Sequence, residues 1–237
     1  MNKILITGAS SAIGRKLISL IDKKNQIIIA HYNRSKNFLN FLKINKFKSK
    51  IILIKSDFSK RNDLNIFIKK IKRHDVDTII HLVGKRLEIK RFEKTSFNNY
   101  LQEISVAFES IYEILKIILP KMIKKNKGKI VFMLSSVTFD RPSAYMSPYV
   151  SLKYLLLGLV KSLSSEYKGA NINFNSISPS MMDTPFLKNL DKKFIEINKQ
   201  LNPSKKLLNI NKVVKKIEFL ISPNSNKIKG VNFLIKN

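Results

Sequence analysis

The chain has 237 residues, of which 44% are hydrophobic, and it contains no cysteine. This length can bury a large core, and no shift in composition divides the sequence, so we expect one domain over residues 1–237. The lack of cysteine excludes a disulfide framework and a thiolate zinc site, and it is typical of a reducing compartment. We therefore expect no metal site.

The formal net charge is +29, which raises the question of a nucleic-acid partner. The lysines are spread from end to end and interleaved with Asn and Ile, which favours a solvated basic surface. An acidic macromolecule or an anionic substrate is the next interpretation, and specific nucleic-acid recognition is the least favoured. Met1 leads directly into a predicted strand, and no apolar run approaches the roughly 20 residues that span a bilayer. We expect a soluble cytoplasmic protein without membrane contact.

The first predicted element is a buried strand at residues 4–6, which breaks into small residues between Gly8 and Gly14. A helical pattern carrying Leu17, Ile18 and Ile21 follows. Such a turn brings backbone N–H groups and a helix N-terminus to one point, which attracts phosphate, and small side chains let a pyrophosphate approach the backbone. The same residues are also compatible with an ordinary tight turn.

The rest of the chain alternates between strand and helix patterns. Further strands are predicted at 26–31, 50–55, 78–83, 129–134, 171–177 and 231–235, with helices at about 38–42, 64–71, 97–125, 149–167 and 213–220. This order predicts an α/β fold, a doubly wound parallel sheet of about seven strands with helices on both faces. Its ligand crevice should lie at the carboxyl ends of the strands. The Lys-rich segment 186–202, bounded by two prolines, is predicted to be the most mobile.

The predicted helix at 149–167 follows Ser147, a good N-cap, and Pro148, which suits the first helical position. Tyr149 and Lys153 then lie one turn apart on the same face. Apolar side chains surround most of this helix, more than one sheet can cover. We therefore expect a homodimer or homotetramer formed through the helices at 97–125 and 149–167.

The whole chain resembles the short-chain dehydrogenase/reductase family of cytosolic NAD(P)-dependent oxidoreductases, which have one Rossmann-type domain. The resemblance rests on motifs in order at the ends of successive strands: Thr7-Gly8 with Gly14, Asp57, Gly84, Ser135-Ser136, Tyr149-x-x-x-Lys153, and Pro179 with Thr184. Each motif is weak alone, but six in order are specific.

The resemblance implies that Tyr149 exchanges a proton with the substrate oxygen. Reducing a carbonyl by hydride transfer leaves charge on that oxygen, so a proton donor must stand beside it. Lys153 would lower the pKa of the phenol and hold the nicotinamide ribose, and Ser136 would hydrogen-bond the substrate oxygen. The spacing to Tyr149 favours Ser136, whereas counting along the fifth strand favours Ser135.

The residues after the second strand bear on the choice of cofactor. They include no carboxylate to bind the 2′-hydroxyl of NAD, but Arg34 and Ser35 could bind the 2′-phosphate of NADP, so NADP(H) is favoured over NAD(H). The cofactor contacts implied by the resemblance are Gly8, Ser10, Ser11, Ile13, Gly14, Asn33, Arg34, Ser35, Asp57, Phe58, Val83, Gly84, Tyr149, Lys153, Pro179 and Thr184.

Two departures from the family pattern stand out. Ala107 occupies the position of an Asn that usually completes a water-mediated proton relay to the Lys, and His81-Leu82-Val83-Gly84 replaces Asn-Asn-Ala-Gly. The expected function is an NADPH-dependent carbonyl reductase, with a 3-oxoacyl thioester on an acidic carrier protein, a keto-sugar or a secondary metabolite as substrate. The alternative is an NADP-binding scaffold or regulator with impaired turnover.

Overall fold

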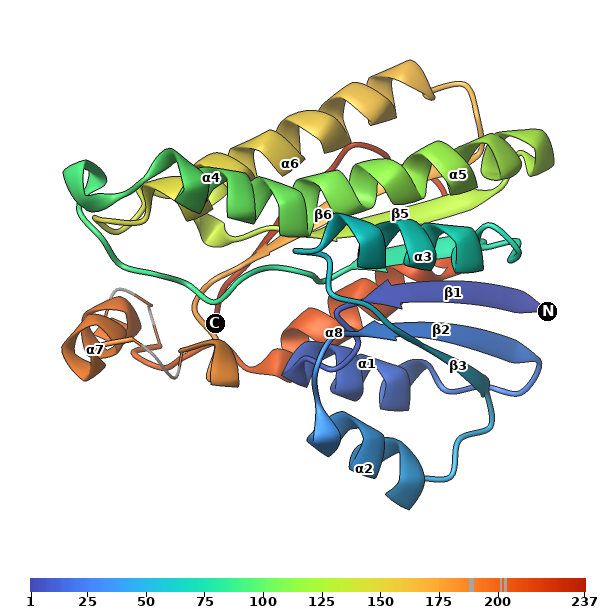
Figure 1. Ribbon diagram of the computed structural model, residues 1–237, viewed down its shortest axis with the longest axis horizontal. Helices are drawn as coiled ribbons and strands as arrows, with labels where there is room; N and C mark the ends of the chain where they lie inside the picture. Colours follow the sequence, from blue (N-terminus) through green and yellow to red (C-terminus); the bar gives the residue numbers. More distant parts are fainter. Residues whose placement is uncertain (188–189, 201, 203) are drawn as a thin grey trace.

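The computed structural model describes residues 1–187, 190–200, 202 and 204–237. Seven parallel strands form one sheet in the order β3-β2-β1-β4-β5-β6-β7 (Figure 1). The strands are β1 (Asn2–Thr7), β2 (Gln26–Tyr32), β3 (Lys50–Lys55), β4 (Thr78–His81), β5 (Gly128–Met133), β6 (Ile172–Pro179) and β7 (Asn232–Ile235). The α/β class, the parallel sheet and its seven strands are confirmed.

Helices cover both faces of the sheet. They are α1 (Ala12–Ile21), α2 (Lys36–Ile44), α3 (Arg61–Ile71), α4 (Phe97–Glu103), α5 (Ser110–Lys125), α6 (Ser147–Glu166), α7 (Lys192–Gln200) and α8 (Ile210–Ile221). One core cluster packs α3, α5 and α6 on one face, and a second packs α1, α2 and α8 on the other (Figure 1). Within the described residues, none of the helices has the length and apolar content that crossing a membrane would require.

The helix predicted over 97–125 is continuous, but its middle is a π-helical segment, η2 (Ile104–Glu109), between α4 and α5. In a π segment the backbone hydrogen bonds join residues five apart, whereas those of an α-helix join residues four apart. Such segments often occur at functional sites. Ala107 lies in this segment and is fully buried. The irregularity therefore falls at the position for which the resemblance noted above implies a relay Asn.

Two local predictions differ from the structure. Ser147 is the first residue of α6 and not its N-cap, which is Met146, although Pro148 lies in the first turn as expected. The segment 186–202 includes the helix α7 and the short 3-10 helix η4 (Pro185–Leu187), whereas the sequence predicted neither. Residues 188, 189 and 201 of this segment lie outside the described residues.

The order in which strands are added to the sheet reverses between β1 and β4. The chain passes from β1 outward to β2 and β3 and then returns to β4 on the other side of β1. Thr7 pairs with His81, so the ends of β1 and β4 lie side by side. In open α/β sheets ligands bind in the crevice beyond such a point, which is where the Gly8 turn lies.

Candidate active site

The turn after β1 requires glycine at two positions. Gly8 has a φ of +72°, and a Cβ there would lie 3.1–3.2 Å from backbone atoms of Leu82 and Val83. A Cβ on Gly14 would lie 2.5–2.7 Å from the backbone of Ala9, so α1 packs against the turn itself. Ser11 caps α1 by accepting a hydrogen bond from the Gly14 amide at 3.0 Å. The first amides of α1 have no partner within the helix, and together with this crowded glycine turn they fit a dinucleotide diphosphate.

His31 holds the turn against the neighbouring strands. Its Nδ1 accepts from the Gly8 amide at 3.1 Å, so Nε2 carries the proton and donates to the Ser56 carbonyl at 3.1 Å. The ring stacks on Phe58 with centroids 3.8 Å apart. Burial lowers the pKa of His31 to about 4, against the opposing effects of the Ser56 carbonyl and Asp57. This neutral ring therefore fixes the glycine turn relative to β3.

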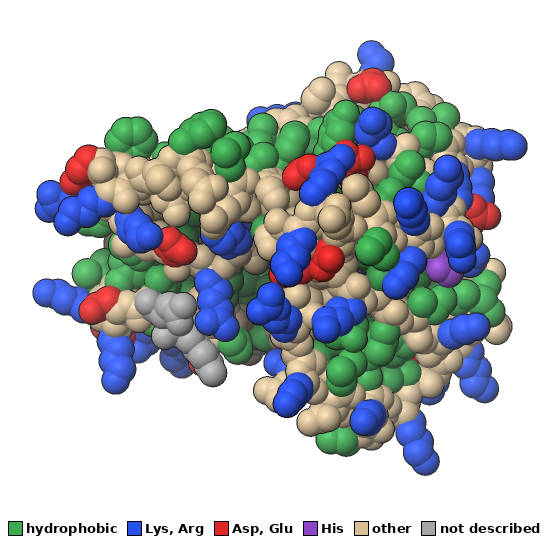
Figure 2. Space-filling model, in the orientation of Figure 1, with side chains coloured by type: hydrophobic (Ala, Val, Ile, Leu, Met, Phe, Trp, Pro, Cys, Tyr) green, Lys and Arg blue, Asp and Glu red, His purple; other side chains and the backbone are tan. Residues whose placement is uncertain are grey.

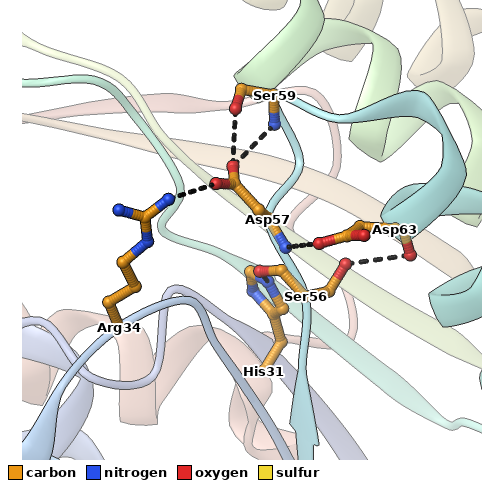
Figure 3. Close-up of polar contacts among 6 residues, drawn as sticks. All are labelled: His31, Arg34, Ser56, Asp57, Ser59 and Asp63. Atoms are coloured by element: carbon orange, nitrogen blue, oxygen red, sulfur yellow. Dashed lines mark hydrogen bonds and ion pairs between the residues drawn. The ribbon is translucent and has the colours of Figure 1, made fainter.

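Asp57 lies in the loop after β3 and makes several polar contacts (Figure 3). Its Oδ1 accepts from the hydroxyl and the amide of Ser59 at 2.6 and 3.1 Å, and its own amide donates to Asp63 Oδ2 at 3.2 Å. Partial burial opposes ionisation, but the contacts with Ser59, Asn33 and Arg34 lower the pKa of Asp57. Asp57 is thus a fixed carboxylate near the glycine turn.

Arg34 and Ser35 follow β2 at the carboxyl end of that strand. The Arg34 side chain is 77% exposed and forms an ion pair with Asp57 at 3.5 Å. The Ser35 hydroxyl caps α2 by accepting from the Phe38 amide at 3.1 Å. Arg34 is therefore free to turn toward an anion, whereas the Ser35 oxygen is committed to the helix cap.

His81 links β1, β4 and the π-helical segment. Its Nε2 donates to the Ala107 carbonyl at 2.9 Å, so Nδ1 accepts from the Thr7 hydroxyl at 2.8 Å. Burial lowers the pKa of His81 to about 3, although the Ala107 carbonyl acts in the opposite direction. The imidazole thereby satisfies a carbonyl at the π segment, which is a structural role.

Tyr149 and Lys153 lie together in the first turns of α6. The Lys153 ammonium is 5.3 Å from the centroid of the Tyr149 ring and donates to the Met133 carbonyl at 3.0 Å. Burial lowers the pKa of Lys153 to about 8, with Glu103 opposing the change. Burial also raises the pKa of Tyr149 to about 12, and the charge of Glu103 adds to this rise. The pair therefore combines a protonated phenol and a buried amine at the end of β5.

Of the two serines after β5, Ser135 is the one whose side chain lowers the pKa of the Tyr149 phenol, against the larger effect of burial. Ser136 instead begins the 3-10 helix η3 (Ser136–Thr138). Both serines therefore remain candidates for the catalytic role, and Ser135 is the one with an electrostatic effect on the phenol.

The remaining predicted cofactor residues lie at or after the carboxyl ends of the strands. Val83 and Gly84 follow β4, and Pro179 ends β6, beside the same edge of the sheet as Tyr149. Thr184 precedes η4, where its carbonyl accepts from the Leu187 amide at 3.0 Å. Phe58 is only 3% exposed, so any contact it makes with a cofactor must involve its backbone. Ser10, Ile13 and Asn33 lie in or beside the turns already described.

A groove of about 810 Å³ lies between the loop after β4 and the segment that contains α7. Its apolar wall includes Leu87 and Phe194, which pack in or against a small hydrophobic cluster that also contacts Tyr149, Met181 and Phe186. Its charged lining residues are Lys85, Arg86, Glu88, Lys90 and Asp191. The groove is therefore apolar inside with a mixed charged rim.

Two residues of this region were not predicted. His31 was assigned only to the end of a strand, and Glu103 was not singled out. The sequence could have indicated that Glu103 is buried. It lies four residues before Ala107 and eight before Ile111, on the buried face of its helix. A carboxylate on a buried stripe requires an explanation.

Comparison with known proteins agrees with this geometry. A sequence model described as short chain dehydrogenase matches residues 2–194. The 3-oxoacyl-[acyl-carrier-protein] reductase FabG of Buchnera aphidicola subsp. Baizongia pistaciae is 28% identical over 231 residues, covering 95% of this chain and 92% of that protein.

Two solved structures show the same fold at low identity. A 3-oxoacyl-[acyl-carrier protein] reductase from Brucella melitensis with bound NAD has a TM-score of 0.85 at 17% identity, covering 99% of this chain and 89% of that one. A variant of actinorhodin polyketide ketoreductase with NADPH has a TM-score of 0.86 at 16% identity, covering 99% and 95%. Both cofactors thus occur among structures with this fold.

Proposed function

Because this chain belongs to the short-chain dehydrogenase family, we propose that it is an NADPH-dependent carbonyl reductase that uses Ser135, Tyr149 and Lys153. The observation that carries the proposal is the placement of the Lys153 ammonium over the Tyr149 ring, with Ser135 acting on the same phenol. When bound, the nicotinamide dinucleotide supplies the hydride. The glycine turn after β1 and Asp57 would hold its diphosphate and adenosine ends.

The three side chains divide the remaining work. Ser135 would donate a hydrogen bond to the carbonyl oxygen and orient it, and Tyr149 would donate its hydroxyl proton to the oxygen as charge develops there. Lys153 would stabilise the resulting phenolate, because an opposite charge nearby favours the ionised form. Its bond to the Met133 carbonyl fixes the ammonium in that position.

The preference for NADPH rests on Arg34. No carboxylate follows β2 directly, and the exposed guanidinium beside Asp57 can exchange this ion pair for a 2′-phosphate. Exposed ion pairs contribute little, so the exchange costs little. Charge-assisted contacts between guanidinium and phosphate are stronger.

For the substrate, we favour a 3-oxoacyl thioester carried by an acidic protein. The apolar interior of the groove suits an acyl chain, and Lys85, Arg86 and Lys90 offer cations at its rim. The Buchnera relative, named 3-oxoacyl-[acyl-carrier-protein] reductase, agrees with this choice. Figure 2 shows Lys and Arg side chains distributed over the visible face, which does not favour a nucleic-acid groove.

We also propose that α4, α5 and α6 form a homo-oligomeric interface. Large apolar side chains are exposed along these helices, with Phe97 73%, Tyr154 49% and Tyr112 46% exposed. Exposed apolar patches of this kind mark association sites. Light scattering should give a dimer or tetramer, and a monomer would contradict the interface.

The test is oxidation of NADPH and NADH by the purified protein over a panel of ketones, keto-sugars and acetoacetyl thioesters, beside measurement of cofactor binding. Turnover with NADPH and a thioester supports the proposal. Tight NADPH binding without turnover on any substrate favours the second candidate, a cofactor-binding scaffold, which the absence of a polar side chain at Ala107 motivates.

A further inference from the structure

Glu103 is a buried carboxylate whose surroundings do not neutralise it. The residue is 7% exposed, and its Oε2 is buried without a hydrogen-bond partner among the described residues. A buried polar atom of this kind is costly and is retained only where something requires it. Among the residues that the structure describes, none supplies a partner for this oxygen.

Glu103 lies beside the same cavity as Tyr149. It is the last residue of α4, which packs against α6. Glu103 and Tyr149 together line a small cavity of about 20 Å³, and Thr95 and Asn99 add polar side chains to its wall. A cavity needs about 10–15 Å³ to hold a water molecule, so this one accommodates a single water with several polar partners.

The cavity also reaches solvent. Glu88 and Lys90 line it and form an ion pair with each other at 3.1 Å, and their side chains are 53% and 49% exposed. A proton can therefore pass from solvent to the carboxyl group without crossing the apolar core. The titratable or charged groups around Glu103 are Lys85, Glu88, Lys90, Tyr145, Tyr149 and Lys153.

We propose that Glu103 is a positioning residue that relays protons from the solvent side of this cavity to the Tyr149–Lys153 pair, a role that rests on the reductase function proposed above. After Tyr149 has given its proton to the substrate oxygen, the O–H bond of the Glu103 carboxyl group breaks and its proton passes through the cavity water. A new O–H bond forms on the phenolate. The carboxylate then takes a proton from water at the open end, which restores both groups.

The electrostatics agree with a proton donor. Burial raises the pKa of the Glu103 carboxyl group, while Lys153 and Lys85 partly oppose the rise and Glu88 adds to it. A raised pKa keeps the carboxyl group protonated to a higher pH than in solution, which favours a role as proton donor. Ala107, one turn further on, has no side chain that could take this part.

The test compares Glu103→Gln with Glu93→Gln, which makes the same change on a carboxylate that is 65% exposed and does not line the cavity. We expect Glu103→Gln to lower kcat about tenfold or more and to alter its pH profile, with unchanged NADPH affinity, because it removes a proton donor but no cofactor contact. Glu93→Gln should match the wild type. A Glu103→Gln variant with wild-type kcat and pH profile would overturn the relay.

Glu103→Asp separates proton transfer from packing, because it keeps a carboxyl group in a shorter side chain. Partial activity in Glu103→Asp above that of Glu103→Gln supports the relay. If both variants bind NADPH normally and lose kcat equally, Glu103 only fills space, and the proposal fails.

A second measurement requires neither bound cofactor nor turnover. Infrared spectra of the protein with labelled Glu should show a protonated carboxyl band that persists to higher pH than the bands of the exposed Glu carboxyl groups and disappears in Glu103→Gln. Absence of that band from the wild type would overturn the relay even if the variant failed to bind NADPH. If the wild-type protein reduces no carbonyl, both the reductase function and the relay are refuted. If the wild-type protein turns over and Glu103→Gln has the same pH profile, only the relay is refuted.

Discussion

The ammonium of Lys153 lies over the face of the Tyr149 ring, 5.3 Å from its centroid, and is held there by the Met133 carbonyl. Both residues come from one helix, but the carbonyl comes from the end of β5, so the sheet sets the position of the cation. Burial lowers the pKa of Lys153 to about 8, and above that pH the amine loses the charge that would stabilise a phenolate.

Tyr149→Phe should abolish carbonyl reduction and leave NADPH affinity nearly unchanged, because it removes the proton donor but keeps the ring. General acid catalysis contributes about 10²–10⁴-fold, so kcat should fall by at least about 100-fold. Tyr154→Phe is the matched control, since Tyr154 lies on the same helix with its side chain exposed. Equal activity of Tyr149→Phe and the wild type, in steady-state NADPH oxidation, would remove the proposed acid.

Ser135→Ala should lower kcat/KM more than Ser136→Ala. The Ser135 side chain lowers the pKa of the phenol, whereas Ser136 starts a 3-10 helix. Loss of one hydrogen bond to developing charge costs about 10²–10³ in rate. Steady-state kinetics of the two variants distinguishes the two serines. A larger loss of kcat/KM in Ser136→Ala would show that Ser136 contacts the substrate oxygen instead.

Arg34→Asp should shift the preference from NADPH toward NADH. A carboxylate would repel the 2′-phosphate and accept from the 2′-hydroxyl. Lys43→Asp makes the same change of charge in the last turn of α2, away from the β2 end, and should leave the ratio unaltered. The ratio of kcat/KM for the two cofactors is the measurement, and an unchanged ratio in Arg34→Asp would refute the contact.

Gly14→Ala should destabilise the protein by about 1–3 kcal/mol, because the added Cβ would overlap the Ala9 backbone. Cofactor affinity should fall as well, since the turn must move. Gly158→Ala is the counterpart in α6, where a Cβ meets nothing within 4 Å, and it should stabilise by about 0.5–1 kcal/mol. Urea unfolding and NADPH titration of both variants check the pair, and a fully stable Gly14→Ala would contradict the close packing.

Acid should weaken the fold through the two buried imidazoles. Burial lowers the pKa of His31 to about 4 and of His81 to about 3, from an ordinary value of 6.5. The unfolded state therefore binds more protons below pH 6.5, and stability falls as pH falls through this window, by up to about 1.4 kcal/mol per pH unit for each ring. Urea unfolding between pH 4 and 7 measures the slope.

His81→Asn removes one titrating ring and should reduce that slope by about one proton. Asn can still donate to the Ala107 carbonyl, which limits the direct loss of stability. The buried His31 keeps its own contribution and serves as the internal reference. A slope identical to that of the wild type would show that His81 does not titrate on unfolding.

Much of the fold could be predicted because its signals are local. Buried parallel strands are continuous β-branched runs, as in β1 and β2, and the helices between them carry apolar stripes, so their order along the chain predicts a doubly wound sheet. The glycine turn was predictable for the same reason, since Gly8 and Gly14 are needed by backbone geometry within a few residues. The spacing of Tyr149 and Lys153 is likewise a property of one helix.

The sequence by itself therefore determined the class of the fold, the glycine turn and the Tyr149–Lys153 pair. Only the tertiary structure decided that the Ser135 side chain lowers the pKa of the Tyr149 phenol, that His31 and His81 link the strand ends, and that Glu103 shares a cavity with Tyr149. Each of these contacts joins residues from different elements. Their distances depend on how the strand ends and helices pack around the crevice, which no local pattern in the chain encodes.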